Sequence, residues 1–288
     1  MKTITVLSGK GGVGKSAVAA SLAVLLSEKH SLIAVDCDVD APNLALVLGA
    51  KEPHSTRKIS SSEKAFFDEN KCNSCGKCKE VCAFSALEWN KKNHKPSIIS
   101  YFCEGCGACS IVCPENAFKI NKVENAEIFE SHTNHNFDII SAQLKTGASG
   151  SGKVVFELRK QAFDKSPELI IVDSPAGIGC PVIASVKGSD FVVAVTEPSP
   201  SGLSDLKRAL QVVEYFGIPA GIIINKFDLN KKYCLKIEEF TKEKGYPILN
   251  KLPYDKAFVE ALVNLKPIVL FKKEYKKDFD KIIKQIPI

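Results

Sequence analysis

The sequence lacks any long apolar segment. None of its apolar runs approaches the roughly 18 residues that a membrane-spanning helix needs, so we expect no membrane span. The chain begins directly with a strand-like apolar pattern, which predicts that no signal peptide is present. Long basic blocks are also absent, and the formal net charge of +6 is modest for 288 residues. We therefore expect no binding to nucleic acid and predict a cytoplasmic protein.

A glycine-rich segment near the N-terminus has the pattern of a phosphate-binding loop. Residues 9–16 fit G-x-x-x-x-G-K-[ST] in full, between an apolar run at 4–7 and a helical pattern at 17–26. Glycines let backbone N–H groups converge on phosphate oxygens, and the start of the helix adds positive potential. Lys15 is predicted to reach the terminal phosphates, and Ser16 to bind Mg²⁺. The expected nucleotide contacts in this loop are Gly9, Lys10, Gly11, Gly12, Val13, Gly14, Lys15, Ser16 and Ala17.

A lysine near the start of the loop, Lys10, indicates which class of P-loop proteins the sequence resembles. With it, the segment resembles the deviant Walker A loop of the MinD/ParA/Mrp class of ATPases. The resemblance implies that Lys10 reaches the nucleotide of another subunit, as an arginine finger acts in trans. It also implies an ATP-dependent dimer, either of two identical chains or of this chain with a similar protein. Both Lys10 and Lys15 are then catalytic in an Mg²⁺-dependent ATPase that is slow without its partner.

Acidic residues follow two of the expected buried strands. Asp36 and Asp38 come after residues 31–35, and Asp173 comes after residues 168–172. Open α/β sheets bind ligands at the carboxyl ends of their strands. The MinD-class resemblance implies that Asp38 orients or activates the attacking water, with Asp36 near the metal. It also implies that Asp173 holds Mg²⁺ through water.

Three further residues are expected to contact the nucleotide. By the same resemblance, the backbone N–H of Gly177 reaches the γ-phosphate, and Pro253 belongs to a loop that packs on the base. Asn225 begins an N-K-x-D motif, which reads guanine in GTPases and adenine in the MinD class. We expect ATP, because the other motifs belong to that class.

Cysteine is abundant, and eight of the eleven cysteines form an internal repeat. The spacing C-x-x-C-x-x-C-x-x-x-C occurs at 72–82 and again at 103–113, where Pro114 follows. Beside a nucleotide loop, so many cysteines indicate metal rather than disulfides. Paired C-x-x-C motifs also build zinc sites, but this doubled spacing is that of bacterial two-cluster ferredoxins. One 4Fe–4S cluster is assigned to Cys72, Cys75, Cys78 and Cys113, and the other to Cys82, Cys103, Cys106 and Cys109.

These motifs together resemble the MinD-superfamily ATPases that contain an inserted ferredoxin domain. The expected fold is α/β, a doubly wound and mostly parallel P-loop NTPase sheet with a deviant Walker A loop and an inserted α+β ferredoxin-like domain. The expected domains are 1–56 and 124–288 for the ATPase and 57–123 for the insert. Apolar residues at helical spacing in 271–286 predict a last helix, which we place on the sheet in preference to a membrane surface.

Several functions fit this architecture. The first is an ATPase that couples nucleotide-driven dimer change to assembly or transfer of iron–sulfur or related metalloclusters on a partner. The alternatives are ATP-gated electron transfer, which resembles the nitrogenase iron protein, and a MinD-like spatial switch with redox-sensing clusters. The expected partner is a redox or metallocluster protein. Cys180 lies seven residues after Asp173, where the nitrogenase iron protein also has a cysteine. It is either a transient metal ligand or, as we favour, a small buried residue that opens a helix beside Pro181.

Overall fold

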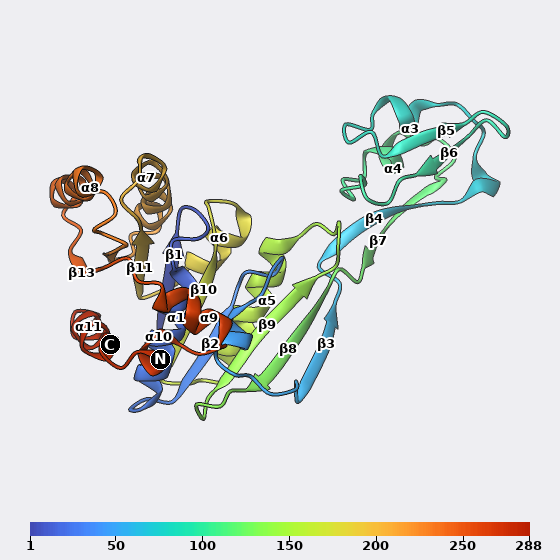
Figure 1. Ribbon diagram of the computed structural model, residues 1–288. Coiled ribbons are helices and arrows are strands. Elements are labelled where there is room, and N and C mark those ends of the chain that lie inside the picture. The colour runs from blue at the N-terminus through green and yellow to red at the C-terminus, as the bar shows by residue number, and fades with distance from the viewer. The chain divides into compact units, whose positions relative to one another are not determined.

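A nine-stranded sheet is the framework of the computed structural model, which describes all residues 1–288 (Figure 1). Its strand order is β13-β12-β11-β1-β10-β2-β9-β8-β3, and the neighbours from β13 through β9 pair in parallel. The strands are β1 (Lys2–Ser8), β2 (Leu32–Asp36), β3 (Ser55–Ile59), β8 (Ala126–His132), β9 (Asp138–Leu144), β10 (Leu169–Ala176), β11 (Phe191–Thr196), β12 (Ala220–Asn225) and β13 (Ile248–Leu252). This arrangement confirms the mostly parallel α/β sheet.

The parallel strands are apolar on both faces because helices cover both sides. Along β11, Val193 packs into one core and its neighbours Val192 and Ala194 into the other, as the alternation of strand side chains requires. The first core includes residues of α1 (Lys15–Ser27), α2 (Leu44–Val47), α9 (Ala257–Val263), α10 (Ile268–Phe271) and α11 (Tyr275–Ile283). The second includes residues of α6 (Cys180–Val186), α7 (Pro200–Tyr215) and α8 (Lys231–Lys244). The remaining large helix is α5 (Ser151–Asp164).

The C-terminal helix packs on the protein itself. Tyr275, Phe279 and Ile282 of α11 are buried in the first core. The apolar face of α11 therefore packs in the protein core, as we expected from the sequence in preference to a membrane surface. No helix of the structure combines the length and the apolar character that crossing a membrane would require.

The chain divides into two units, each of which is discontinuous in sequence. The larger contains Met1–Arg57, Ile128–Gln143 and Ser151–Ile288, and the smaller contains Lys58–Glu127 and Leu144–Gly150. The sequence analysis did not assign residues 144–150 to the smaller unit. We call this smaller unit the cysteine unit.

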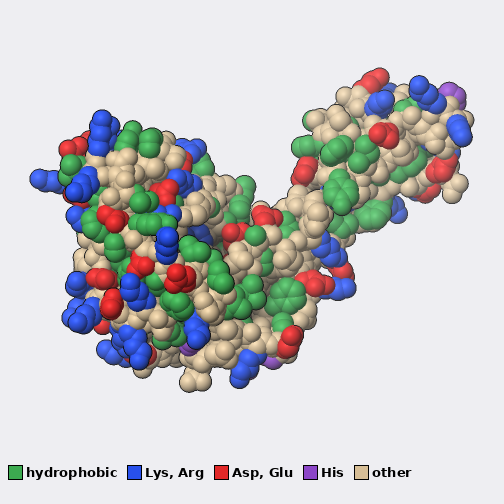
Figure 2. All heavy atoms as spheres, viewed as in Figure 1, with side chains coloured by type: hydrophobic (Ala, Val, Ile, Leu, Met, Phe, Trp, Pro, Cys, Tyr) green, Lys and Arg blue, Asp and Glu red, His purple; other side chains and the backbone are tan.

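Two short antiparallel pairs build the cysteine unit. Strand β4 (Ser62–Phe67) pairs with β7 (Phe118–Val123), and β5 (Leu87–Asn90) pairs with β6 (Lys95–Ile98). The 3-10 helix η1 (Glu69–Lys71), α3 (Lys77–Glu80) and α4 (Ala108–Val112) complete it. Its core is small and rich in cysteine, while several large hydrophobic side chains lie on its surface (Figure 2).

The base of the cysteine unit is held by one buried asparagine. Asn125 Oδ1 accepts the backbone N–H of Ser61 at 2.8 Å, and its Nδ2 donates to the carbonyl of Ser149 at 2.9 Å. The backbone of Asn125 bonds on both sides, to Ile59 and to Lys145. A single side chain therefore joins both sequence segments of this unit.

Candidate functional site

The phosphate-binding loop runs from the end of β1 to the start of α1, and two of its glycines are required by close packing. A Cβ on Gly9 would lie 2.2 Å from the carbonyl oxygen of Asp205, at which α7 approaches the loop. Gly14 has a φ of +95°, and a Cβ there would lie 2.5 Å from the amide nitrogen of Asn225. The loop is thus shaped by contacts with α7 and β12 as well as by its own sequence.

The two predicted charges nearest the phosphates form a buried ion pair. Lys15 Nζ lies 2.5 Å from Asp173 Oδ1, and the two side chains are 9% and 2% exposed. The same ammonium lies 3.4 Å from the hydroxyl of Ser16. Asp173 faces Val6 of β1 and Asp36 of β2 in the register of the sheet, so three strand ends meet here. The structure therefore brings the predicted phosphate lysine and Mg²⁺ ligands together.

Asp36 orders the segment that follows β2. Its Oδ1 accepts the backbone N–H of Asp38 at 3.0 Å, and its Oδ2 accepts those of Asn43 and Leu44 at 2.9 Å. Burial, together with repulsion from Asp173, raises the pKa of Asp36 to about 7. These bonds make Asp36 a positioning residue for the Asp38 loop, and its place near a metal stays a prediction.

Asp38 is half-buried beside the same lysine. Burial raises the pKa of its carboxyl group, and the charge of Lys15 opposes that rise. Asp38 is therefore in an environment suited to holding a water or its proton. Its role in orienting water stays a prediction.

Lys10 is engaged within its own chain. Its Nζ lies 2.7 Å from Glu197 Oε1 and also donates to the hydroxyls of Ser199 and Ser201. The other oxygen of Glu197 lies 2.9 Å from Lys226 Nζ, which donates in turn to the carbonyl of Gly12. We call these three charged side chains the Lys10–Glu197–Lys226 cluster. In this structure the cluster holds Lys10 beside its own loop.

The sequence analysis did not identify Glu197 or Lys226 as members of the site. Glu197 directly follows β11 at the ligand-binding edge of the sheet, and that position was the available signal. Lys226 stands in the N-K-x-D motif, in which the residue expected to contact the base is Asn225.

The remaining predicted nucleotide contacts are placed at the same edge with other partners. Gly177, with a φ of +102°, donates its N–H to the carbonyl of Ser8 at 3.0 Å. Asn225 donates its side-chain amide to the carbonyl of Val13 at 2.8 Å. Pro253 directly follows β13. Their contacts to phosphate, adenine and the base stay predictions.

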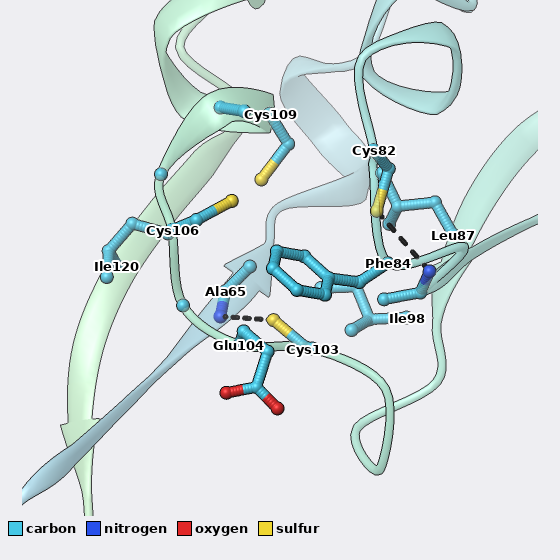
Figure 3. A pocket seen from close by; sticks show the side chains of 14 residues that line it. Ala65, Cys82, Phe84, Leu87, Ile98, Cys103, Glu104, Cys106, Cys109 and Ile120 are labelled. Carbon is cyan, nitrogen blue, oxygen red and sulfur yellow. Dashed lines mark hydrogen bonds between the residues drawn. The ribbon is translucent and has the colours of Figure 1, made fainter. Parts of the chain in front are cut away.

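A cavity of the cysteine unit is lined by the four thiols assigned to the second cluster. They are Cys82, Cys103, Cys106 and Cys109. Figure 3 shows their sulfur atoms around the cavity, with the ring of Phe84 among them. The Phe84 side chain is 44% exposed, so it can turn outward. The donor set and its convergence fit a four-thiolate metal site.

The other cysteine loop is built in the same way. Burial, together with the nearby Cys72 and Cys75, raises the pKa of the Cys78 thiol. The Nδ2 of Asn73 donates to Glu115 at 2.9 Å, which ties this loop to the segment just after Cys113. Cys72, Cys75 and Cys78 therefore lie near one another, and Cys113 packs in the same small core as Cys72 and Cys78. Their joint ligation of a cluster stays a prediction.

Backbone N–H groups donate to the thiols in a repeated pattern. Ala86 donates to Cys82 Sγ and Ala117 to Cys113 Sγ, both at 3.3 Å. The two donors stand four residues after their acceptors, so the sequence repeat is also a structural repeat. Such bonds lower the charge on cluster-ligating sulfurs and tune reduction potential.

The three cysteines outside this unit differ in exposure. Cys37 and Cys234 are buried, whereas Cys180 is exposed at the start of α6. The expectation that Cys180 is a buried residue is therefore wrong, although it does open a helix beside Pro181. Cys180 lies close to Gly152 of α5. If Gly152 carried a Cβ, that atom would lie 3.1 Å from the Cβ of Cys180. Exposure arises because α6 packs on the sheet through Val182 and Val186 instead.

Comparison with known proteins supports the fold and defines the family. An uncharacterized protein of Methanocaldococcus jannaschii is 39% identical over 81% of this chain and 82% of its own length. The iron-sulfur cluster carrier protein of that organism is 24% identical, over 98% of this chain and 83% of its own. The structure is similar to the septum site-determining protein MinD of Pyrococcus horikoshii, solved with Mg-ADP. That likeness has a TM-score of 0.62 and 21% identity, and covers 99% of this chain and 96% of the other.

The match to a family model covers most of the chain. The model of the CobQ/CobB/MinD/ParA nucleotide binding domain matches residues 4–268, a range that contains the phosphate-binding loop and the aspartates around it. The chain therefore belongs to the CobQ/CobB/MinD/ParA family of nucleotide-binding domains.

Proposed function

We propose that this protein is an ATP-hydrolysing iron–sulfur protein. In this proposal, a nucleotide-driven change of a dimer is coupled to the assembly or transfer of iron–sulfur or related metalloclusters on a partner protein. The observation that carries it is the presence, in one chain, of the Lys15–Asp173 phosphate site and the cavity lined by four cysteines. The similarity to a protein named as an iron-sulfur cluster carrier supports the same function.

Nucleotide binding would exchange the partners of the buried ion pair. Lys15 would leave Asp173 for the terminal phosphates, and Asp173 with Ser16 would hold Mg²⁺, so that each buried charge keeps a partner. Mg²⁺ supplies charge stabilisation at the phosphates. Asp38 would orient the attacking water, and Lys10 would act on the nucleotide of a second subunit after leaving Glu197.

The cysteine unit would hold two 4Fe–4S clusters. Cys72, Cys75, Cys78 and Cys113 would hold one, and Cys82, Cys103, Cys106 and Cys109 the other. Such clusters supply one-electron chemistry when they are bound. The domain boundaries at 57 and 123 belong to the same proposal, with residues 144–150 added to the insert.

Burial of two of the eight repeat thiols favours a second candidate function, ATP-gated electron transfer to a partner. Cys78 and Cys103 are only 7% and 8% exposed, and Cys103 Sγ accepts the N–H of Ala65 at 3.4 Å. Ligands buried in a core suit permanent clusters better than cargo that must leave. In this candidate the clusters stay, and ATP controls docking.

One anaerobic experiment tests the proposal and separates the two candidates. Protein reconstituted with ⁵⁷Fe is mixed with an apo acceptor of 4Fe–4S clusters, with and without MgATP, and the label is followed in both proteins. Metallocluster transfer predicts ATP-dependent label in the acceptor, and Lys15→Ala should abolish it. Electron transfer predicts that about eight iron atoms stay on the chain, and that clusters first reduced with dithionite pass their electrons to an added one-electron acceptor faster with MgATP than without it. A chain that binds no iron, or one whose behaviour is unaffected by Lys15→Ala, would refute both.

A further inference from the structure

Four side chains that can bind a metal meet at one end of β3, β8 and β9, which are neighbours in the sheet (Figure 1). Glu130 and His132 lie on β8, Asp138 begins β9, and His54 immediately precedes β3. The backbone N–H of His54 donates to the carbonyl of Glu130 at 3.0 Å. Backbone pairing therefore fixes these positions, and none of the four belongs to the nucleotide site or to the cysteine unit.

The donor atoms of three of these side chains converge, and His132 reaches the group through Asp138. One ring nitrogen of His54 and one carboxylate oxygen each of Glu130 and Asp138 lie within 4.8 Å of one another. His54 Nε2 is 3.1 Å from Glu130 Oε1, and His132 Nδ1 is 2.5 Å from Asp138 Oδ1. The two imidazole rings stack with centroids 4.2 Å apart. Donors at about 2.1 Å from one zinc ion would be about 3.4 Å apart, so a small turn of the partly exposed Asp138 completes the set.

A buried oxygen without a partner belongs to the amide that contacts Glu130. Gln161 of α5 donates its Nε2 to Glu130 Oε2 at 3.1 Å, which fixes the orientation of its amide. The Oε1 of that amide is buried and has no hydrogen-bond partner. Buried acceptors are rarely left unpaired, and a water bound to a metal would supply the missing donor.

The only ammonium group in contact with these four side chains is that of Lys165, which forms an ion pair with Glu130 Oε1. One lysine compensates one carboxylate, whereas the group contains two, Glu130 and Asp138. The Lys165 side chain is 36% exposed, so its ammonium can leave for solvent. A divalent cation would compensate both carboxylates at once and would compete with this lysine.

We propose that His54, His132, Glu130 and Asp138 form a binding site for a divalent cation of the zinc class. Two imidazoles with two carboxylates suit zinc, whereas Mg²⁺ and Ca²⁺ prefer oxygen ligands alone. Bound metal would fasten the ends of three strands of the larger unit. The site does not depend on the proposed function. Its test uses protein whose cysteine unit carries iron, as that function proposes, but it does not rely on ATP hydrolysis or on cluster transfer.

Calorimetric titration with Zn²⁺ and optical titration with Co²⁺ test the proposal on anaerobic protein whose cysteine unit is loaded with iron. Loading occupies the eight repeat thiols and leaves Cys180 as the exposed thiol, and thiolate-bound Co²⁺ is recognised by its intense near-ultraviolet bands. We expect one equivalent of Zn²⁺ to bind and only weak visible Co²⁺ bands to appear. His54→Ala combined with His132→Ala should weaken binding about 100-fold or more. His132 is 63% exposed, so its single substitution should not impair folding and should weaken binding in the same direction.

Two further variants sharpen the result. Lys165→Met removes the competing charge and should tighten Zn²⁺ binding about tenfold or more. His30→Ala is the matched control, because His30 is another partly exposed histidine beside a carboxylate, at 3.6 Å from Glu168, and lacks further ligands. Binding that is unchanged in the double variant, lost in His30→Ala or weakened in Lys165→Met would overturn the proposal. Co²⁺ bands of thiolate type alone would do the same.

Discussion

In the ATP-dependent dimer that we propose, the Lys10–Glu197–Lys226 cluster makes the dimer equilibrium sensitive to one carboxylate. If Lys10 acts in the other subunit, each chain must first release it from Glu197, at 2.7 Å, and from the hydroxyls of Ser199 and Ser201. Glu197→Gln keeps the shape of the side chain and removes its charge. We therefore expect this variant to dimerise more tightly with ATP than the wild type does.

The magnitude follows from the exposure of the pair. Lys10 and Glu197 are 28% and 19% exposed, so their attraction is screened, and such pairs are worth about 0.2–1 kcal/mol. Burial raises the pKa of Glu197, but the hydrogen bonds from Lys10 and Lys226 lower it by more, so the Glu197 carboxylate stays charged at neutral pH. At about 1 kcal/mol per chain and two chains per dimer, Glu197→Gln should lower the dimer dissociation constant about 30-fold.

Sedimentation equilibrium with a slowly hydrolysed ATP analogue measures this constant. Lys226→Met is the matched variant. It removes the second lysine that pairs with Glu197, so Glu197 should hold Lys10 more strongly and the dimer should weaken. In a Lys10→Ala background, Glu197→Gln should give no gain. A gain that persists in that background, or a dimer that Glu197→Gln weakens, would refute the reasoning.

Three other predictions concern Lys15, Asp36 and Cys82. Lys15→Ala should abolish ATP binding measured by calorimetry, because it removes the phosphate cation, and should leave the iron content unchanged. The pKa of Asp36 is raised to about 7, so its contribution to stability is complete at low pH and is lost as the pH rises through 7. The melting temperature of the nucleotide-free protein should therefore fall more between about pH 5 and pH 8 in the wild type than in Asp36→Asn, and equal slopes would contradict this assignment. Cys82→Ser should reduce the iron content from about eight atoms to about four, whereas Cys234→Ser, which changes a buried thiol outside the cysteine unit, should not; equal losses would argue against the ligand assignment.

The parts of the nucleotide site that could be predicted are those encoded by neighbouring residues. The phosphate loop has a complete local pattern, and Asp36 and Asp173 each follow an apolar run, at the end of β2 and within β10, where these parallel strands lie side by side. Local apolar patterns therefore predict which segments are buried strands, and the geometry of parallel strands predicts the edge of the sheet at which a ligand binds.

The contacts that could not be predicted join residues distant in the sequence. Lys10 and Glu197 belong to the loop after β1 and the loop after β11, and no local pattern pairs them. Asp36 bonds three backbone groups because the following loop folds back over it, a conformation that the sequence pattern does not specify. The exposure of Cys180 depends on which face of α6 meets the sheet.

The hydrogen bonds of Asn125 to Ser61 and Ser149 also affect how the chain folds during its synthesis. All eight repeat cysteines precede residue 114, but Ser149, which accepts from Asn125, leaves the ribosome a few seconds later at ordinary elongation rates. All eight thiols therefore emerge before the hydrogen bond between Asn125 and Ser149 can form. A fragment that stops at residue 127 lacks the Ser149 bond, so a self-standing cysteine unit would have to include residues 144–150 as well as 58–127.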